Sequence, residues 1–360
     1  MKNVALAVAI SWRLAVASTL PSVEEAAVAP DPVAAQSAIA ALRARGQEGL
    51  DAFWRAHERD LSRLRAGAVP SSEDARLLLT LDAIARQKDA LYARLFWYTD
   101  LDAARAAARA GGRPILSLRL LGNLDEELSC ANGRFFRTIL YADPEVADVL
   151  RSCFVLHWKS VRPVPKVTID FGDGRVLKQT ISGNSVHYVL DADGQPVDAL
   201  PGVYAPGVFL ERLERAGEIA RQLAGLPRAD KEARLREYHG MRLAALGRAW
   251  KDEIRKLARE DGEPEEAAVT IAAHTIESEE RHAAIDGWFA TGPVPADADG
   301  LNARVSAELY LASIDDPWLG MASRDVYTAL PEPSAAAPGK SASGSGDRQR
   351  TQRRSVASAR

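Results

Sequence analysis

The stretch from Gly112 to Leu213 decides the fold, and three segments carry it: GRPILSLRLLGN (112–123), LSCANGRFFRTILYADPEVADVLRSCFVLHWKS (128–160) and GNSVHYVLDADGQPVDALPGVYAPGVFLERL (183–213). Ile115–Leu121 is a short apolar run between turn residues, and Cys153–Trp158 is a second one, so both predict buried strands. The residues between them predict a helix that Pro144 interrupts, with Cys130 at its start. A strand, a helix and a strand in this order predict a parallel pair with a right-handed crossover.

Two hairpins and a helix follow the second strand. Residues 166–180 alternate in polarity on both sides of Gly172-Asp173-Gly174, which predicts the first hairpin. Residues 186–200 turn at Asp193-Gly194 and predict the second hairpin. Residues 206–224 then carry apolar side chains at helical spacing.

The flanks of this α/β stretch predict helices. We expect a leader over residues 1–30, a helical N-terminal region over 31–100, the α/β domain over 101–225, a helical C-terminal region over 226–330 and a disordered basic tail over 331–360. The two long C-terminal helices, 229–258 and 263–289, are charged, and we expect their polar faces to be solvated surface.

Composition excludes some classes of protein. The chain has 360 residues and a net charge of -3, which argues against a dedicated nucleic-acid binder. No apolar run reaches the ~18 residues of a membrane-spanning helix.

The N-terminus resembles a short secretory signal. It has Lys2, an apolar run from Val4 to Trp12 and small residues after it, which favour export to the periplasm or the extracellular space. Arg13 interrupts the apolar region, so a cytoplasmic protein with an ordinary first helix is the alternative.

The order of elements over 113–213 resembles the thioredoxin-like superfamily. The resemblance implies a central mixed sheet with an extra β-hairpin, flanked by the helical regions. The redox pair of that family is C-x-x-C at a helix start, whereas this chain has Cys130-Ala131-Asn132-Gly133 and no second thiol there. The family also has a cis-proline before the hairpin strand, and Asn184-Ser185 stands at that place here. Dithiol exchange is therefore not expected.

Cys130 is the candidate catalytic residue. A helix N-terminus favours a thiolate, and Arg134 and Arg137 add positive charge. The acidic residues at 125–127 oppose them, so we expect these charges nearly to cancel and the thiol pKa to show no large shift. The alternative is a structural cysteine in a site that no longer works. Cys153 belongs at the other end of the sheet, where we expect a core residue and not a disulfide partner.

His187 is the candidate base, because its strand begins beside the missing proline, and His157 is the weaker candidate. The alternative for both is a hydrogen-bonded core histidine. The candidate substrate-binding residues surround Cys130 in sequence or in the expected fold: Asn132, Gly133, Arg134, Asn184 and Ser185.

No cofactor or metal site is expected, because His274 and His282 lie about two turns apart and no phosphate-binding loop occurs. Three functions stay open. One is protein interaction or a residual monothiol activity at Cys130, with a protein thiol or peptide as partner. The second is a non-catalytic scaffold or binding module. The third is an enzyme whose site lies between the α/β core and the helices, near Asp316-Pro317-Trp318. The first function leaves open whether the chain is an enzyme.

Overall fold

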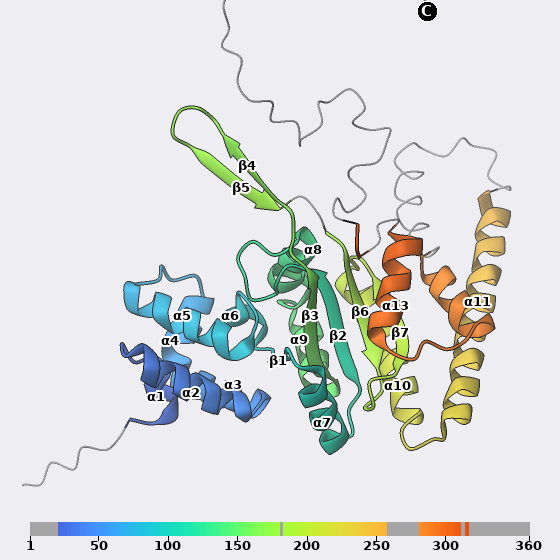
Figure 1. Cartoon of the computed structure of the whole chain (residues 1–360), viewed down its shortest axis with the longest axis horizontal. Coiled ribbons are helices and arrows are strands. Elements are labelled where there is room, and N and C mark those ends of the chain that lie inside the picture. The colour runs from blue at the N-terminus through green and yellow to red at the C-terminus, as the bar shows by residue number, and fades with distance from the viewer. Residues whose placement is uncertain (1–20, 181–182, 258–280, 311–313, 317–360) are drawn as a thin grey trace, which may run out of the picture. The chain divides into compact units, whose positions relative to one another are not determined.

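A five-stranded mixed sheet lies at the centre of the fold (Figure 1). The computed structural model describes residues 21–180, 183–257, 281–310 and 314–316, without the side chains of 249–257. The strands lie in the order β1-β3-β2-β6-β7. Their bounds are Trp97–Tyr98 for β1, Ile115–Leu121 for β2, Val155–Arg162 for β3, Ser185–Leu190 for β6 and Pro196–Pro201 for β7.

The predicted parallel pair is confirmed. β2 pairs parallel with β3, with Ile115 opposite Val155 and Leu118 opposite Trp158. β6 runs antiparallel to β2, and β7 antiparallel to β6, so the second predicted hairpin is also confirmed. The sequence did not predict β1, which pairs parallel with β3 over only two residues.

Helices cover both faces of the sheet. α7 (Leu101–Gly111) connects β1 to β2, and α9 (Pro144–Cys153) lies on the return path from β2 to β3. The two connections run in opposite directions across the sheet, so right-handed crossovers place these helices on opposite faces. α10 (Pro206–Gln222) packs against α9 and β6, whereas α13 (Ala298–Arg304) packs against β6 from the other side, where Asp299 binds Arg119.

Local sequence sets the ends of these helices. Asp100 caps α7 by accepting a hydrogen bond from Ala103 N–H, and Gly112 ends it with φ 59°. Asp143 caps α9, and Pro144 takes its first position, where the missing N–H has no helical partner to lose. Before α9 lie α8 (Ala131–Phe135) and a π-helical turn, η1 (Phe136–Leu140). The expected interruption at Pro144 is confirmed.

The helices α1 to α6 enclose an apolar core of their own. Their bounds are Val23–Ala26, Pro32–Ala44, Gln47–Ala56, Glu58–Arg65, Ser72–Ala85 and Ala90–Ala93. Leu42, Leu50, Phe53, Leu61 and Leu81 are among its fully buried side chains. Trp158 Nε1 of β3 donates to Arg86 O at 2.7 Å, and Arg43 donates to Trp97 O at 3.1 Å, so hydrogen bonds join this region to the sheet.

The first predicted hairpin is confirmed as a separate two-stranded sheet of β4 (Lys166–Asp170) and β5 (Val176–Thr180). Figure 1 shows it extending away from the central sheet. Its apolar side chains are exposed, with Ile169 at 44% and Phe171 at 53%.

The C-terminal region contains α11 (Arg228–Leu257), helical residues 281–291, α13 and a π-helical turn, η2 (Val305–Leu309). The prediction of solvated polar faces is wrong for the inner side of α11, because Lys231 and His239 are buried against the sheet. They bind carboxylates that the sequence did not link to this helix.

The described residues as far as Asp315 belong to one compact unit, within which the predicted boundaries at 100 and 225 stay predictions. Among the described residues, no helix is long and apolar enough to cross a membrane. Residues 258–280, which include the first part of the expected 263–289 helix, lie outside the described residues. Most of the expected leader, most of residues 311–330 and the whole expected tail also lie outside them.

Candidate functional site

Cys130 lies at the start of α8, as predicted. It is the N-cap residue, and its Sγ accepts a hydrogen bond from Gly133 N–H at 3.3 Å. The side chain is fully buried, with 0% exposed. Burial raises the pKa of the Cys130 thiol, and the backbone amides of Gly133 and Asn132 with the Arg134 charge offset only part of this. The expectation that nearby charges would leave the thiol pKa almost unchanged did not include burial, which is the largest influence on that pKa.

The two arginines near Cys130 have different roles. Arg134 donates to Ser129 O at 2.8 Å and to the Thr180 hydroxyl, so it ties the end of β5 to the loop before α8. Arg137 is buried and donates to Glu126 O at 2.7 Å, and it forms an ion pair with Asp89 at 3.2 Å. Arg134 therefore acts on the thiol electrostatically, whereas Arg137 holds the preceding loop.

Asn132 connects α8 to the segment before β6. Its Nδ2 donates to Gly183 O and, at 2.8 Å, to Ser185 Oγ. Tyr310 O–H donates to Ser185 O at 2.7 Å. Gly133 is buried, and an added Cβ would lie 3.1 Å from Ser129 Oγ. The structure thus joins the segment containing Asn184 and Ser185 to the Cys130 helix, and Cys130 itself is fully buried.

His187 is a core histidine. Its Nε2 shares a hydrogen bond with the Tyr141 hydroxyl at 2.6 Å, and its ring meets those of Phe136 and Phe209 edge-on, with centroids 4.6 Å and 5.0 Å apart. Burial lowers the pKa of His187 to about 3. A base with that pKa gains little by taking a thiol proton at neutral pH. Tyr141, which the sequence did not point to, also interacts electrostatically with Cys130, and burial together with Cys130 raises the pKa of Tyr141.

The predicted core position of Cys153 is wrong. It is partly exposed as the last residue of α9, and its Sγ lies 3.5 Å from Ser152 Oγ. Helix α9 extends farther than predicted, so the strand begins two residues after Cys153. Both cysteines are free.

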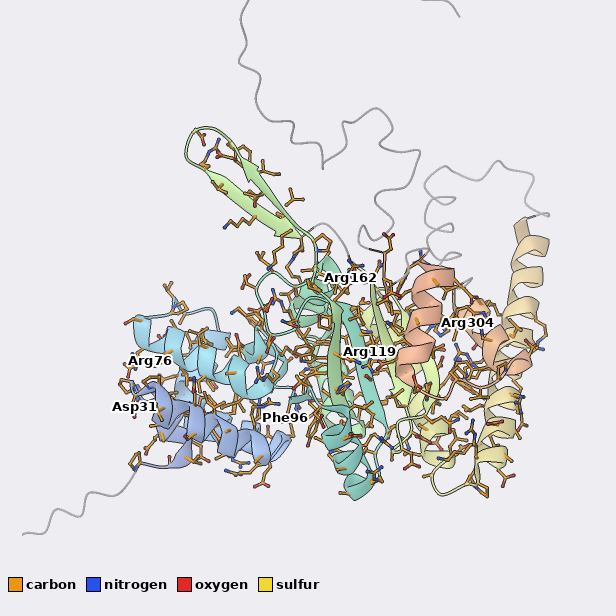
Figure 2. All side chains as sticks on the ribbon, viewed as in Figure 1. Asp31, Arg76, Phe96, Arg119, Arg162 and Arg304 are labelled. Atoms are coloured by element: carbon orange, nitrogen blue, oxygen red, sulfur yellow. The ribbon has the colours of Figure 1, made fainter. Side chains whose placement is uncertain are left out.

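A second polar cluster lies on the face of the sheet opposite to His187 and includes Arg119, which Figure 2 labels. His157 Nδ1 lies 2.8 Å from Ser117 Oγ and 3.3 Å from Arg119 NH1. A guanidinium only donates, so Nδ1 accepts and the ring is neutral. Burial, with the Arg119 charge, lowers the pKa of His157 to about 3. Asp299 binds Arg119 at 3.0 Å and Lys159 at 2.7 Å.

This second cluster contains a serine beside a histidine, which is also the pairing that activates a nucleophile. Ser117 is fully buried in a central strand. A hydroxyl that is fully buried gives a substrate carbonyl no access. We therefore interpret the cluster as a means of holding the buried Arg119 charge and α13 against β2.

A third cluster lies between β7, α11 and residues 281–291. Asp198, His239 and Asp286 are buried with ligand atoms close enough to hold a metal ion. His239 Nε2 lies 2.9 Å from Val197 O, a group that only accepts, so this nitrogen carries a proton. Its Nδ1 lies 2.7 Å from Asp286 Oδ1, and a proton between them satisfies both.

Arg242 supplies further positive charge to the third cluster. It pairs with Asp198 and lies 3.6 Å from Asp286. Burial alone would raise the pKa of Asp198, but Arg242 and His282 outweigh it and lower the pKa. Arg242 thus contacts both buried carboxylates. These contacts favour a structural ion-pair network, and the expected absence of a metal site stays a prediction. His274 lies outside the described residues.

No protein-family model matches the sequence, and no relative is found among curated proteins.

Proposed function

We propose that this chain is a thioredoxin-like protein in which the thiol site has become structural, and that it acts as a non-catalytic binding module. Sequence and structure support the fold part of the proposal. The sheet order β1-β3-β2-β6-β7 has a parallel half and a terminal antiparallel hairpin, and Cys130 begins the helix that follows β2. The resemblance implies a central mixed sheet with an extra hairpin and a cysteine at a helix start, so these features support the proposed fold.

The environment of Cys130 carries the functional part. A nucleophilic thiol needs access to its substrate and a share of thiolate near neutral pH. Cys130 is 0% exposed, and burial raises the pKa of its thiol. Asn132, two residues after Cys130, donates hydrogen bonds to Gly183 O and Ser185 Oγ, so its side chain is already engaged within the chain.

The binding part rests on the β4–β5 hairpin. Its apolar side chains Ile169, Phe171 and Leu177 are exposed at 44%, 53% and 39%. Burying exposed apolar groups against a partner is favourable at ~25 cal/mol per Å². Such a surface therefore favours protein interaction over small-molecule chemistry.

The residual monothiol function has one observation in its favour, the hydrogen bond from Gly133 N–H to Cys130 Sγ, which would stabilise a thiolate. Reduction of insulin by dithiothreitol separates the two functions. We expect the wild-type chain to leave the rate at that of dithiothreitol alone, and the Cys130→Ser variant to do the same while keeping the wild-type circular dichroism. A rate increase that disappears in Cys130→Ser would overturn the proposal.

A further inference from the structure

The β4–β5 hairpin has a free edge. Its sheet contains two strands, and among the described residues no other strand lies beside β4 (Figure 1). An isolated two-stranded hairpin is only marginally stable in water. An unpaired strand edge also presents backbone N–H and C=O groups that can pair with another chain. Pairing with a further strand would therefore stabilise the hairpin, and the unpaired edge of β4 offers the backbone groups for it.

The hairpin has an apolar and a polar face. Residues paired across strands share a face, so Ile169 and Leu177 lie together on the apolar side. Arg175 lies over the Phe171 ring, 5.1 Å from its centroid, at the end of the hairpin. Lys166, Asp170 and Lys178 lie on the polar face.

The sequence of β4, Lys-Val-Thr-Ile-Asp, is complementary to itself when it is read antiparallel about its middle residue. We propose that β4 pairs with β4 of a second copy of this chain, about a two-fold axis at Thr168. The product is a four-stranded antiparallel sheet, β5-β4-β4-β5. A two-fold axis makes each contact occur twice.

Every cross-strand pair in this register is favourable. Lys166 lies opposite Asp170 of the second copy, and Val167 opposite Ile169, and each pair occurs twice. Thr168 lies opposite its own copy. Equivalent pairing through β5 would place Lys178 opposite Lys178, and like charges in that position repel. The charges thus select β4 and this register.

The pairing does not depend on Cys130 chemistry, because, within the part of the chain that the structure describes, the hairpin joins the central sheet at its base and extends away from it (Figure 1). There Thr180 O–H donates to Ser129 O at 3.0 Å. Dimerisation through β4 rests on the binding role proposed for this hairpin and names its partner. Insulin reduction tests the Cys130 part of the proposed function and does not report on dimerisation.

Sedimentation velocity of the full chain over a concentration series tests the proposal. We expect a dimer for the wild-type chain. Lys166→Asp and Asp170→Lys each place like charges in two cross-strand pairs, so each weakens the dimer by roughly thirtyfold. Lys178→Asp changes a charge on the same face of the neighbouring strand, and as the control it leaves the dimer intact.

Mixing the two single variants gives the decisive result. A Lys166→Asp chain beside an Asp170→Lys chain restores opposite charges in both pairs, so the mixture forms a heterodimer although neither variant forms a stable dimer. The mixture also serves as a control for folding of the Asp170→Lys variant, which loses the 2.9 Å hydrogen bond from Gly172 N–H to Asp170. If that loss misfolded the hairpin, mixing the variants would not restore a dimer. A monomeric wild-type chain, dimers that persist in both variants, or a mixture that stays monomeric would each overturn the proposal.

Discussion

Two buried histidines, His157 and His187, should make the folded protein sensitive to mild acid. Burial lowers both pKa values from 6.5 to about 3, so the folded chain holds both rings neutral. In the unfolded chain they titrate near 6.5. Between these values the unfolded state binds more protons, so the free energy of unfolding falls as the pH falls from about 6.5 towards 3.

The magnitude follows from proton linkage. Each histidine with these two pKa values should lower the free energy of unfolding by about 2 kcal/mol between about pH 7.5 and about pH 5, and the pair by about 4 kcal/mol. Burial also lowers the pKa of His282, which adds in the same direction.

Urea denaturation at the two pH values, followed by tryptophan fluorescence, measures this difference. His187→Phe is the matched variant, because the ring lies among Phe136, Tyr141 and Phe209 and the phenyl group has nothing to protonate. It should remove about 2 kcal/mol of the pH-dependent loss, whatever its cost at neutral pH. A pH-independent free energy of unfolding, or a His187→Phe chain that keeps the full loss, would refute the assignment of neutral core histidines.

Two other predictions concern stability, both measured by urea denaturation at neutral pH. Asp299→Asn leaves the buried Arg119 charge without its carboxylate and should lower the free energy of unfolding by about 2 kcal/mol. Lys159→Met removes an exposed partner of Asp299 and should lower it by less than about 0.5 kcal/mol. Equal losses would contradict a role for Asp299 in holding Arg119. Cys130→Ala removes the N-cap acceptor and a buried sulfur and should lower the free energy of unfolding by about 2 kcal/mol. Cys130→Ser keeps an acceptor for Gly133 N–H and should lower it by less. A larger loss for Cys130→Ser would count against Cys130 as the N-cap of α8.

The order of elements was predictable because strong local signals mark it. Ile115–Leu121 and the residues after Cys153 are apolar runs between turn residues, and Asp193-Gly194 marks a hairpin. β1 was not predictable, because two residues carry no period and the strand exists only through pairing with β3.

The site residues were predictable by position but not by environment. Cys130 was expected at a helix start and is found there. Its surroundings include groups far away in sequence, such as Tyr310, which interacts electrostatically with it and which no local pattern connects to it. The same holds for His239, whose partners Val197 and Asp286 lie more than forty residues away on either side.

The central claim is that Cys130 is a structural thiol. The most direct measurement is the rate of alkylation by iodoacetamide against pH in a Cys153→Ser variant, which leaves Cys130 as the sole cysteine. We predict alkylation far slower in the native chain than in urea, with no thiolate reactivity below about pH 8.5. Fast native alkylation with an apparent pKa below that of a free thiol would contradict the account.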